Sequence, residues 1–464
     1  MILQTLLQQF NNTRLLFASG LRGASPAWLA TRLAEQQPCC VIVPDEHLIP
    51  IFEQDLSLFT NANILTYPGH EIPPYTPLSP DQRIAATRLS ALYRLKTSAG
   101  RIMVTSIEAL LRRIMPETVL TGVAEYLLAG EACDREDLLT KLQYLGYEKV
   151  ALAQSVGDFS VRGGIIDIFP PPFAMETGTV HDGPVRLDFF GETIESLRAF
   201  DPFTQRSIGE LAEVTLLPVT DILLDPGTPD IYKKATILFH EYAAKYDWDS
   251  EETARIAERI ATGQRFAGME FFLPLFYHGH GRPSSAVLDF VPKNAVLLLV
   301  DPEGIHQSMD LTLERIYKNY QTAGEKSTPA LPPAELFVEK EEMLRQLGQF
   351  RQLLVTDFTR PDDPVISLGT GNHQLLKQEI ALHRAKLGIL APLSEQIFKW
   401  QNDGHRVVIC CRSARHTKNL AELLSKHSQR LKGKSRYRSY QGLCQQCSGA
   451  SSGSTAWAEE SACN

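Results

Sequence analysis

Short apolar runs alternate with helix-forming segments through the first 115 residues, and this alternation restricts the possible folds more than any other feature. The runs 15–18, 40–44 and 101–105 have the length and composition of buried strands. The helix candidates that alternate with them are 26–35, 81–95 and 107–114. Strands that alternate with helices favour a parallel, doubly wound sheet. The sequence therefore predicts an α/β fold for this region.

Two of the expected helices have recognisable beginnings. Asp81 stands at the start of one, where an acidic side chain suits the helix dipole. Behind it, Ala85, Leu89 and Leu92 follow the i, i+4, i+7 spacing of one helix face. Ser106 precedes the other helix as a potential N-cap. These signals support the helical assignment independently of the alternation.

The pattern changes after Pro116, where a helix at 134–145 leads into short alternating strands. The expected strands are 163–169, 185–190 and 193–200. Glycine and proline clusters separate them, which is typical of an antiparallel α+β unit. Mixed character returns from Val214, and 295–301 has the composition of another buried strand. The simplest assembly is a first domain into which a second domain is inserted.

The remaining third of the chain is less regular. A polar, proline-rich stretch predicts a linker, and a further βα step follows it, with helices at 393–400 and 414–425 around a strand at 406–410. Three of the eight cysteines lie in a final stretch of low complexity without periodicity, for which we expect disorder. This tail resembles an out-of-frame or artificial end. The expected divisions are 1–120 and 213–320 for the first domain, 121–212 for the insert, 321–339 for the linker, 340–430 for a small α/β domain and 431–464 for the tail.

Charge and cysteine usage exclude several classes of protein. With 46 basic and 54 acidic side chains the net charge is −8, which argues against a strongly basic nucleic-acid binder but allows a local basic patch. No run of apolar residues is long enough to cross a membrane, and residues 1–10 predict an amphipathic helix rather than a signal peptide. The adjacent pairs Cys39-Cys40 and Cys410-Cys411 lie in or beside apolar runs. We therefore expect a reduced, cytoplasmic protein.

The segment from Gly20 to Ala27 lies between a strand and a helix, where a phosphate-binding loop would be placed. A working loop has the pattern G-x-x-x-x-G-K-[ST], in which lysine contacts the phosphates and a hydroxyl binds Mg²⁺. Gly20 and Gly23 are present, but Ser25, Pro26 and Ala27 replace the second glycine, the lysine and the hydroxyl. The sequence therefore predicts a strand-to-helix turn without a bound nucleotide.

A second cluster contains Arg162, Arg186 and Phe190. In a strand at 185–190, alternation would place Arg186 and Phe190 on the face opposite the core. An exposed aromatic ring beside an arginine is typical of a protein-binding hot spot. Alternatively, Phe190 covers a second small core and Arg186 pairs with Asp188.

Other candidate chemistry is weak. The histidines lie in dissimilar contexts, and His278-Gly279-His280 has no acidic or cysteine cluster nearby in sequence. A single Cys444-x-x-Cys447 without a second pair is a poor zinc signal. We expect no catalytic residue and no metal site.

Several long stretches resemble a known family. They are Leu65–Tyr75, Ser79-Pro80, Arg88–Tyr93, Gly157–Pro170, Val185–Arg198 and Leu216–Pro218. Together they resemble the N-terminal, UvrB-like portion of the bacterial transcription-repair coupling factors (Mfd), over residues 1 to about 430. The related protein UvrB has an intact phosphate loop and a tyrosine-rich hairpin, whereas this chain has a broken loop and a short proline-rich connection at 73–81.

The resemblance implies a function in transcription-coupled nucleotide excision repair. It implies a helicase-like parallel-sheet domain with a degenerate phosphate loop, and an inserted domain that binds the damage sensor UvrA. The family's UvrA-binding residues match Arg162, Arg186 and Phe190. In the family the C-terminal part can mask this surface. The unit at 340–430 resembles a small domain of unassigned role.

The same resemblance implies what this chain lacks. The regions of the family that bind RNA polymerase, translocate on duplex DNA and use ATP and Mg²⁺ have no counterpart in the sequence, and the similarity stops where the low-complexity tail begins. We therefore expect a truncated or frame-shifted recruitment module that needs no cofactor and is not an enzyme. The alternatives are an ATP-dependent DNA translocase or helicase component, and a UvrB-type protein that binds damaged DNA.

Overall fold

The computed structural model of the chain describes most of its residues. They are 8–9, 13–97, 100–224, 227, 229–278, 281, 283–357, 364–368, 373–387, 390–405, 407, 409 and 414–428, without the side chains of 383–387 and 425–428. The chain divides into two compact units at 370/371. Among the described helices, none combines the length and apolarity that crossing a lipid bilayer requires.

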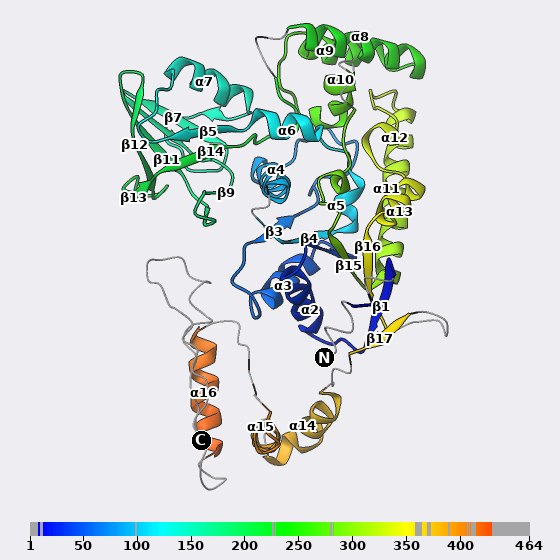
Figure 1. Ribbon diagram of the computed structural model, residues 1–464. Helices are drawn as coiled ribbons and strands as arrows, with labels where there is room; N and C mark the ends of the chain where they lie inside the picture. Colours follow the sequence, from blue (N-terminus) through cyan, green and yellow to red (C-terminus); the bar gives the residue numbers. More distant parts are fainter. Residues whose placement is uncertain are drawn as a thin grey trace. The chain divides into compact units, whose positions relative to one another are not determined.

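The first unit is built on a seven-stranded sheet in which all neighbouring strands are parallel. Its order is β17-β1-β16-β15-β2-β4-β3 (Figure 1). The strands are β1 (Leu15–Ser19), β2 (Cys39–Val43), β3 (Ile64–Tyr67), β4 (Ile102–Ser106), β15 (Val296–Val300), β16 (Arg351–Val355) and β17 (Val365–Ser367). Every residue of β2 and β4 is buried, as expected for strands covered on both faces. The predicted doubly wound α/β fold is confirmed.

Helices cover both faces of this sheet. One face packs against α2 (Ser25–Ala34) and α3 (Leu48–Leu56). The other face packs against α4 (Gln82–Lys96), α5 (Ile107–Leu111) and α11 (Pro302–Glu325). Alternate residues of β2 enter the two cores, because successive side chains in a strand point to opposite sides.

The predicted helix starts are confirmed at atomic level. The carboxylate of Asp81 accepts a hydrogen bond of 2.8 Å from the amide of Arg83, and the hydroxyl of Ser106 accepts one of 3.0 Å from Ala109. However, the helix expected at 107–114 ends at Leu111. Beyond Leu111 the chain forms isolated antiparallel β-bridges instead, between Arg112 and Phe337 and between Ile114 and Ser285.

An inserted domain interrupts the first unit. The strand by which the chain enters it, β5 (Glu125–Leu128), pairs antiparallel with the strand by which the chain leaves it, β14 (Glu213–Leu216). This pairing brings the two connections to the rest of the unit together. Between them lies a six-stranded sheet in the order β13-β12-β11-β8-β7-β6. The insert also contains α6 (Glu117–Val123) at its entrance, α7 (Arg135–Tyr144), β6 (Glu148–Lys149), β7 (Asp158–Arg162), β8 (Ile165–Ile168), β9 (Phe173–Ala174), β10 (Val180–His181), β11 (Val185–Phe190), β12 (Thr193–Phe200) and β13 (Ser207–Leu211).

The insert contains the strands predicted at 185–190 and 193–200. The strand predicted at 163–169 begins later, at Ile165. Gly163 has φ +57°, a left-handed value that glycine adopts without a Cβ clash, and it forms the turn between β7 and β8. The predicted α+β character of the insert is confirmed.

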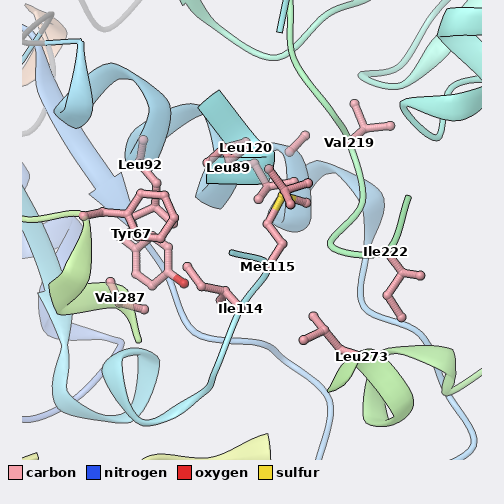
Figure 2. Close-up of a cluster of buried hydrophobic side chains, with 14 of the residues drawn as sticks. Tyr67, Leu89, Leu92, Ile114, Met115, Leu120, Val219, Ile222, Leu273 and Val287 are labelled. Atoms are coloured by element: carbon pink, nitrogen blue, oxygen red, sulfur yellow. The ribbon is translucent and has the colours of Figure 1, made fainter. Parts of the chain in front are cut away.

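The insert and the first sheet share one continuous core. Figure 2 shows part of it, in which Tyr67 of β3 and Leu89 and Leu92 of α4 belong to the same cluster as residues of the chain that returns from the insert. Val219 and Ile222 belong to that return segment and are fully or almost fully buried. Further helices complete this region: α8 (Pro229–Tyr246), α9 (Ser250–Ala261), η1 (Met269–Phe272), α10 (Leu273–His278) and η2 (Val287–Asp289).

The linker predicted at 321–339 is wrong. Helix α11 continues through Glu325, α12 (Pro333–Leu336) follows, and the side chains of Leu331 and Val338 are fully buried. Proline and polar residues suggested a loop, but the few apolar residues between them anchor this stretch to the main core.

The small α/β domain predicted at 340–430 begins too early, because the second compact unit starts only at residue 371. After α13 (Lys340–Leu347), β16 enters the main sheet between β1 and β15. Its register pairs Leu353 with both Leu16 and Leu298, so these residues belong to the first domain.

The described part of the second unit consists of helices. They are α14 (Gln374–Leu387), α15 (Leu390–Asn402) and α16 (Ala414–Ser428), and the last two confirm the helices predicted at 393–400 and 414–425. Arg406, Val408 and Cys410 of the strand predicted at 406–410 lie outside the described residues. So do Cys411, the tail 431–464 with its cysteine pair, and residues 1–7 and 10 of the predicted N-terminal helix.

Candidate partner-binding face

The six-stranded sheet of the insert has one apolar and one polar face. On β11, Val185 and Leu187 are fully buried, whereas Arg186 and Asp188 are only partly exposed and Phe190 retains 80% of its surface. The alternation predicted for this strand is therefore confirmed. Phe190 lies at the end of the strand, opposite Thr193 of β12, and covers no second core.

A row of polar residues crosses the face opposite this apolar core, from strand to strand, and its Ser160 and Asp167 are buried. The strand register places Asp167 of β8 opposite Ser160 of β7 on one side and Arg186 of β11 on the other. Arg186 in turn faces Arg198 of β12, which faces Glu210 of β13. Residues in register on adjacent strands lie about 5 Å apart, so the row is a continuous charged stripe. We call the side of the sheet that carries this stripe the polar face.

Asp167 is the centre of this stripe. Its side chain is completely buried, and both carboxylate oxygens accept hydrogen bonds from Arg186, at 2.7 Å from Nε and 3.0 Å from Nη2. Arg162 donates a further hydrogen bond to the same carboxylate. These bonds raise the pKa of Arg186. A buried carboxylate held by two guanidinium groups fixes the direction of both arginines.

The alternative pairing of Arg186 with Asp188 is wrong. Asp188 instead accepts a 2.8 Å hydrogen bond from the hydroxyl of Ser196, and its nearest cation is Arg198 at 3.5 Å. Arg186 turns the other way because the buried Asp167 offers it a two-pronged contact with ideal geometry.

Asp167 was not among the candidates that the sequence suggested. Its signal was nevertheless present: it is the one charged residue inside Ile165-Ile166-Asp167-Ile168. A carboxylate within a buried strand needs cationic or hydrogen-bonding partners, because an isolated buried charge is very costly. Together, Asp167, Arg162 and Arg186 form a rigid cationic surface with the exposed ring of Phe190 further along β11.

The degenerate phosphate loop lies at the other end of the first unit's sheet, between β1 and α2. Gly20 and Gly23 have left-handed φ values of +76° and +56°. The hydroxyl of Ser25 exchanges hydrogen bonds of 2.7 Å with the backbone of Arg22. Pro26 and Ala27 are buried in the first turn of α2. As predicted, these positions form a strand-to-helix turn.

An acidic side chain from the segment just after β16 contacts this loop. The carboxylate of Asp357 accepts a 2.8 Å hydrogen bond from the amide of Gly20 and pairs with Arg22. A phosphate group here would meet this negative charge instead of a lysine. The residues of the loop therefore do not fit ATP with Mg²⁺. Asp357 was not predicted, because it lies 337 positions from Gly20 in sequence.

Metal binding has no support in the described part of the chain, which contains no cluster of three or more histidine, cysteine or acidic residues suited to an ion. His278 faces Ser284 and Glu335, at 3.3 and 3.7 Å. Cys39 and Cys40 are free buried thiols, and burial raises the pKa of both, to about 12 for Cys39.

Buried charges also gather where the insert returns to the first sheet. Arg88 is almost fully buried, lies 4.3 Å from the ring centre of Tyr67 and donates to the carbonyl of Pro68. Burial raises the pKa of Asp221, against the opposing effect of Arg88 and Arg112. Burial and the same two arginines hold the pKa of His70 well below its usual value.

Comparison with known proteins assigns the insert to a family. The family model described as the UvrB interaction domain matches residues 126–221, the range that contains the whole polar face. The match begins in β5 and ends just after β14, so it covers the strands that carry Arg162, Arg186 and Phe190.

Similarity to whole proteins extends further along the chain. It is 30% identical to a transcription-repair-coupling factor of Myxococcus xanthus over 87% of its own length and 34% of that relative. Relatives of the same description in Escherichia coli and Bacillus subtilis are 28% and 26% identical, over 70% and 62% of this chain and 27% and 24% of theirs. The chain thus spans about a third or less of the length of these relatives. The chain is therefore similar to the transcription-repair-coupling factors over most of its own length, and its residues 126–221 match the UvrB interaction domain.

Proposed function

We propose that this chain recruits UvrA through the polar face of its insert, as the UvrA-binding module of a transcription-repair coupling factor in nucleotide excision repair. One observation carries the proposal: two arginines fixed by a buried carboxylate share a face with a strongly exposed phenylalanine, inside the range that matches the UvrB interaction domain. The residues that would contact UvrA are Arg162, Arg186 and Phe190.

The geometry suits tight binding for a physical reason. Immobilising a flexible arginine at an interface costs about 0.5–1.5 kcal/mol in side-chain entropy. Arg186 is already immobilised by Asp167 and retains only 14% of its side-chain surface, so most of this cost is met during folding. Arg162 keeps 46% of its side-chain surface and offers its charge to a partner. The ring of Phe190 supplies apolar surface that stays exposed to water until a partner binds and buries it.

We propose further that the chain does not hydrolyse ATP through its degenerate loop. The proposal rests on Pro26 and Ala27 in place of the lysine and hydroxyl, and on the carboxylate of Asp357 against Gly20. An active ATP-dependent DNA enzyme, or a UvrB-type protein that binds damaged DNA, would need a phosphate site that this loop does not offer. Fluorescent ATP binding in the micromolar range would contradict this part of the proposal.

We place this function in the cytoplasm. Cys39 and Cys40 are adjacent free thiols, which suits a reducing compartment.

A pulldown tests the proposed function. Purified UvrA is incubated with the tagged wild-type chain and with the variants Arg186→Ala and Phe190→Ala. We expect the wild-type chain to retain UvrA and both variants to retain much less. Asp230→Ala is the matched control, because this exposed residue lies on α8, outside the insert. Equal retention by all four proteins would refute the role of the polar face.

A further inference from the structure

A second exposed aromatic residue lies on the insert, and the sequence did not single it out. Phe203 retains 85% of its surface, the largest exposed fraction among the large apolar side chains of the described residues. It lies in the loop 201–206 between β12 and β13. A single exposed apolar side chain is ordinary on a protein surface, so the meaning of Phe203 depends on what surrounds it.

The loop that carries Phe203 is well ordered. One carboxylate oxygen of Asp201 accepts hydrogen bonds from the amides of Phe203 and Thr204, at 3.0 and 2.6 Å. The backbone of Asp201 also bonds to Arg206 at 2.9 Å and to Gln205 at 2.8 Å. Gln205 adopts a left-handed φ of +60°, which closes the turn. Phe203 is therefore held at the tip of a rigid turn.

Arg186 ties this loop to the polar face. Its Nη1 donates a 3.3 Å hydrogen bond to the carbonyl of Gln205, while its other nitrogens hold Asp167. The guanidinium also lies 4.9 Å from the ring centre of Phe200, which the fold buries. Gln205 donates across the face to the carbonyl of Ala153, at 3.5 Å. The loop is thus folded over the same face that carries Arg162 and Arg186.

The two exposed rings lie at opposite ends of the strand pair β11–β12. Phe190 pairs with Thr193 at the start of β12, and Phe203 follows Phe200 at its end. Eight strand residues at about 3.3 Å each separate the two ends by roughly 25 Å. A standard interface covers about 800 Å² on each partner, equivalent to a disc of roughly 30 Å across. Both rings therefore fit within a single interface of ordinary size.

We propose that Phe203 is a second apolar anchor of the UvrA-binding face, so that one exposed ring lies on each side of the charged stripe. The proposal rests on the proposed function, because UvrA is the occupant we assign to this face. The polar face and the loop that carries Phe203 are joined by one side chain. Arg186 binds the buried carboxylate of Asp167 and also donates a hydrogen bond to the carbonyl of Gln205 in that loop. The complementary surface of UvrA would offer two apolar pockets roughly 25 Å apart, with acidic groups between them.

Titration of the full chain with UvrA tests the proposal. Dissociation constants are measured by calorimetry for the wild-type chain, for Phe203→Ser and for Arg186→Ala/Phe190→Ala. The control is Leu311→Ser, a similarly exposed apolar residue at 65% on α11 of the first domain. We expect Phe203→Ser to weaken UvrA binding about tenfold, because an apolar anchor is lost from the interface, and Leu311→Ser to leave it unchanged.

The outcomes separate this inference from the function on which it rests. If the wild-type chain does not bind UvrA, the proposed function fails. If the wild-type chain binds and the Arg186→Ala/Phe190→Ala variant is weakened while Phe203→Ser is not, only the second anchor is refuted. Because Phe203 is so exposed, its replacement should leave the midpoint of thermal unfolding unchanged. Phe203→Tyr, which keeps the ring, should restore most of the affinity, and failure of this rescue would also count against the proposal.

Discussion

A single buried carboxylate decides how the polar face presents its arginines. Asp167 has no exposed surface and is held by Arg162 and Arg186. Removing one partner from a buried ion pair leaves uncompensated charge and typically costs about 3–5 kcal/mol. Because Arg162 is partly exposed and can turn to solvent, we expect Asp167→Asn to lower the free energy of unfolding by about 3 kcal/mol, at the lower end of that range. Urea denaturation of the chain measures this change.

Asp188 is the matched control for that experiment. It lies one strand away on the same face, is partly exposed and has its nearest cation at 3.5 Å. Exposed pairs of this kind contribute about 0–1 kcal/mol, so Asp188→Asn should cost much less than Asp167→Asn. Equal losses in the two variants would contradict the central position that we give to Asp167.

His70 predicts a pH dependence of stability. Its ring nitrogens are buried, and burial with the charges of Arg88 and Arg112 holds its folded pKa well below the unfolded value of about 6.5. Below that value the unfolded chain binds a proton that the folded chain does not, so stability falls as the pH falls. Between pH 7.5 and 5.5, the wild-type chain should lose about 1.4 kcal/mol more than a His70→Asn variant.

Urea denaturation of both proteins at the two pH values measures that difference. Neighbouring Asp221 and Glu270, whose pKa values are raised by burial, titrate in both proteins and cancel in the comparison. Parallel loss of stability in the two proteins would contradict the prediction, because it would mean that His70 takes up its proton over the same pH range in the folded and unfolded states.

The orientation of a single residue could be predicted from the sequence where it depends on one strand alone. The direction of Arg186 and Phe190 followed from alternation within β11, which is a local property. Asp167 and Asp357 were not predicted, because their roles depend on contacts with residues that are distant in sequence. Asp167 accepts hydrogen bonds from Arg186, 19 residues away, and Asp357 accepts one from Gly20, 337 residues away. Alternation gives the face of a side chain but not the partner that it meets there.

At the level of elements, the segment between α11 and β16 departs most from expectation. Its composition suggested a linker, yet Leu331 is fully buried and belongs to the main core. Leucine-to-alanine changes in cores cost about 2–5 kcal/mol. Leu331→Ala should therefore lower the free energy of unfolding by at least about 2 kcal/mol, as measured by urea denaturation.

Leu344 on α13 serves as the control for this prediction, because it is 40% exposed. Leu344→Ala should cost less than about 1 kcal/mol. A Leu331→Ala variant that is as stable as Leu344→Ala would restore the linker interpretation.

Most helices and central strands of the first domain could be predicted because they are set by local periodicity and caps. The run at 40–44 and the cap at Asp81 are visible in the sequence, and they reappear in the fold as β2 (Cys39–Val43) and the start of α4. The position of β16 could not be predicted in the same way. The position of its five residues in the sheet is set by pairing with β1 and β15, which are distant along the chain. Composition alone therefore assigned it to a later domain.

For the whole molecule, the division into two units predicts which part of the chain binds UvrA. The polar face, its supporting core and the seven-stranded sheet all belong to the unit 1–370. A chain ending at residue 370 should therefore bind UvrA with an affinity within twofold of the full chain, as measured by calorimetry. A loss of tenfold or more would show that residues 371–464 contribute to the interface or to its presentation.

The net charge of the chain and the half-exposed arginines of the polar face together indicate what kind of partner this face would bind. The net charge of −8 gives no general attraction for nucleic acid, so cationic recognition must be local. Arg162 and Arg198 are the half-exposed cations of the polar face, at 46% and 43% of their side-chain surface. This pattern favours a docking surface for an acidic protein patch over an extended DNA groove.

The central claim is that one face of the insert binds UvrA, and its most direct test is the dissociation constant of the complex. Calorimetric titration compares the wild-type chain with Arg186→Ala/Phe190→Ala under identical salt conditions, after circular dichroism has shown that both are folded. Loss of two hot-spot side chains, at about 1–2 kcal/mol or more each, predicts at least a thirtyfold weaker complex. Affinities that agree within twofold would contradict the claim.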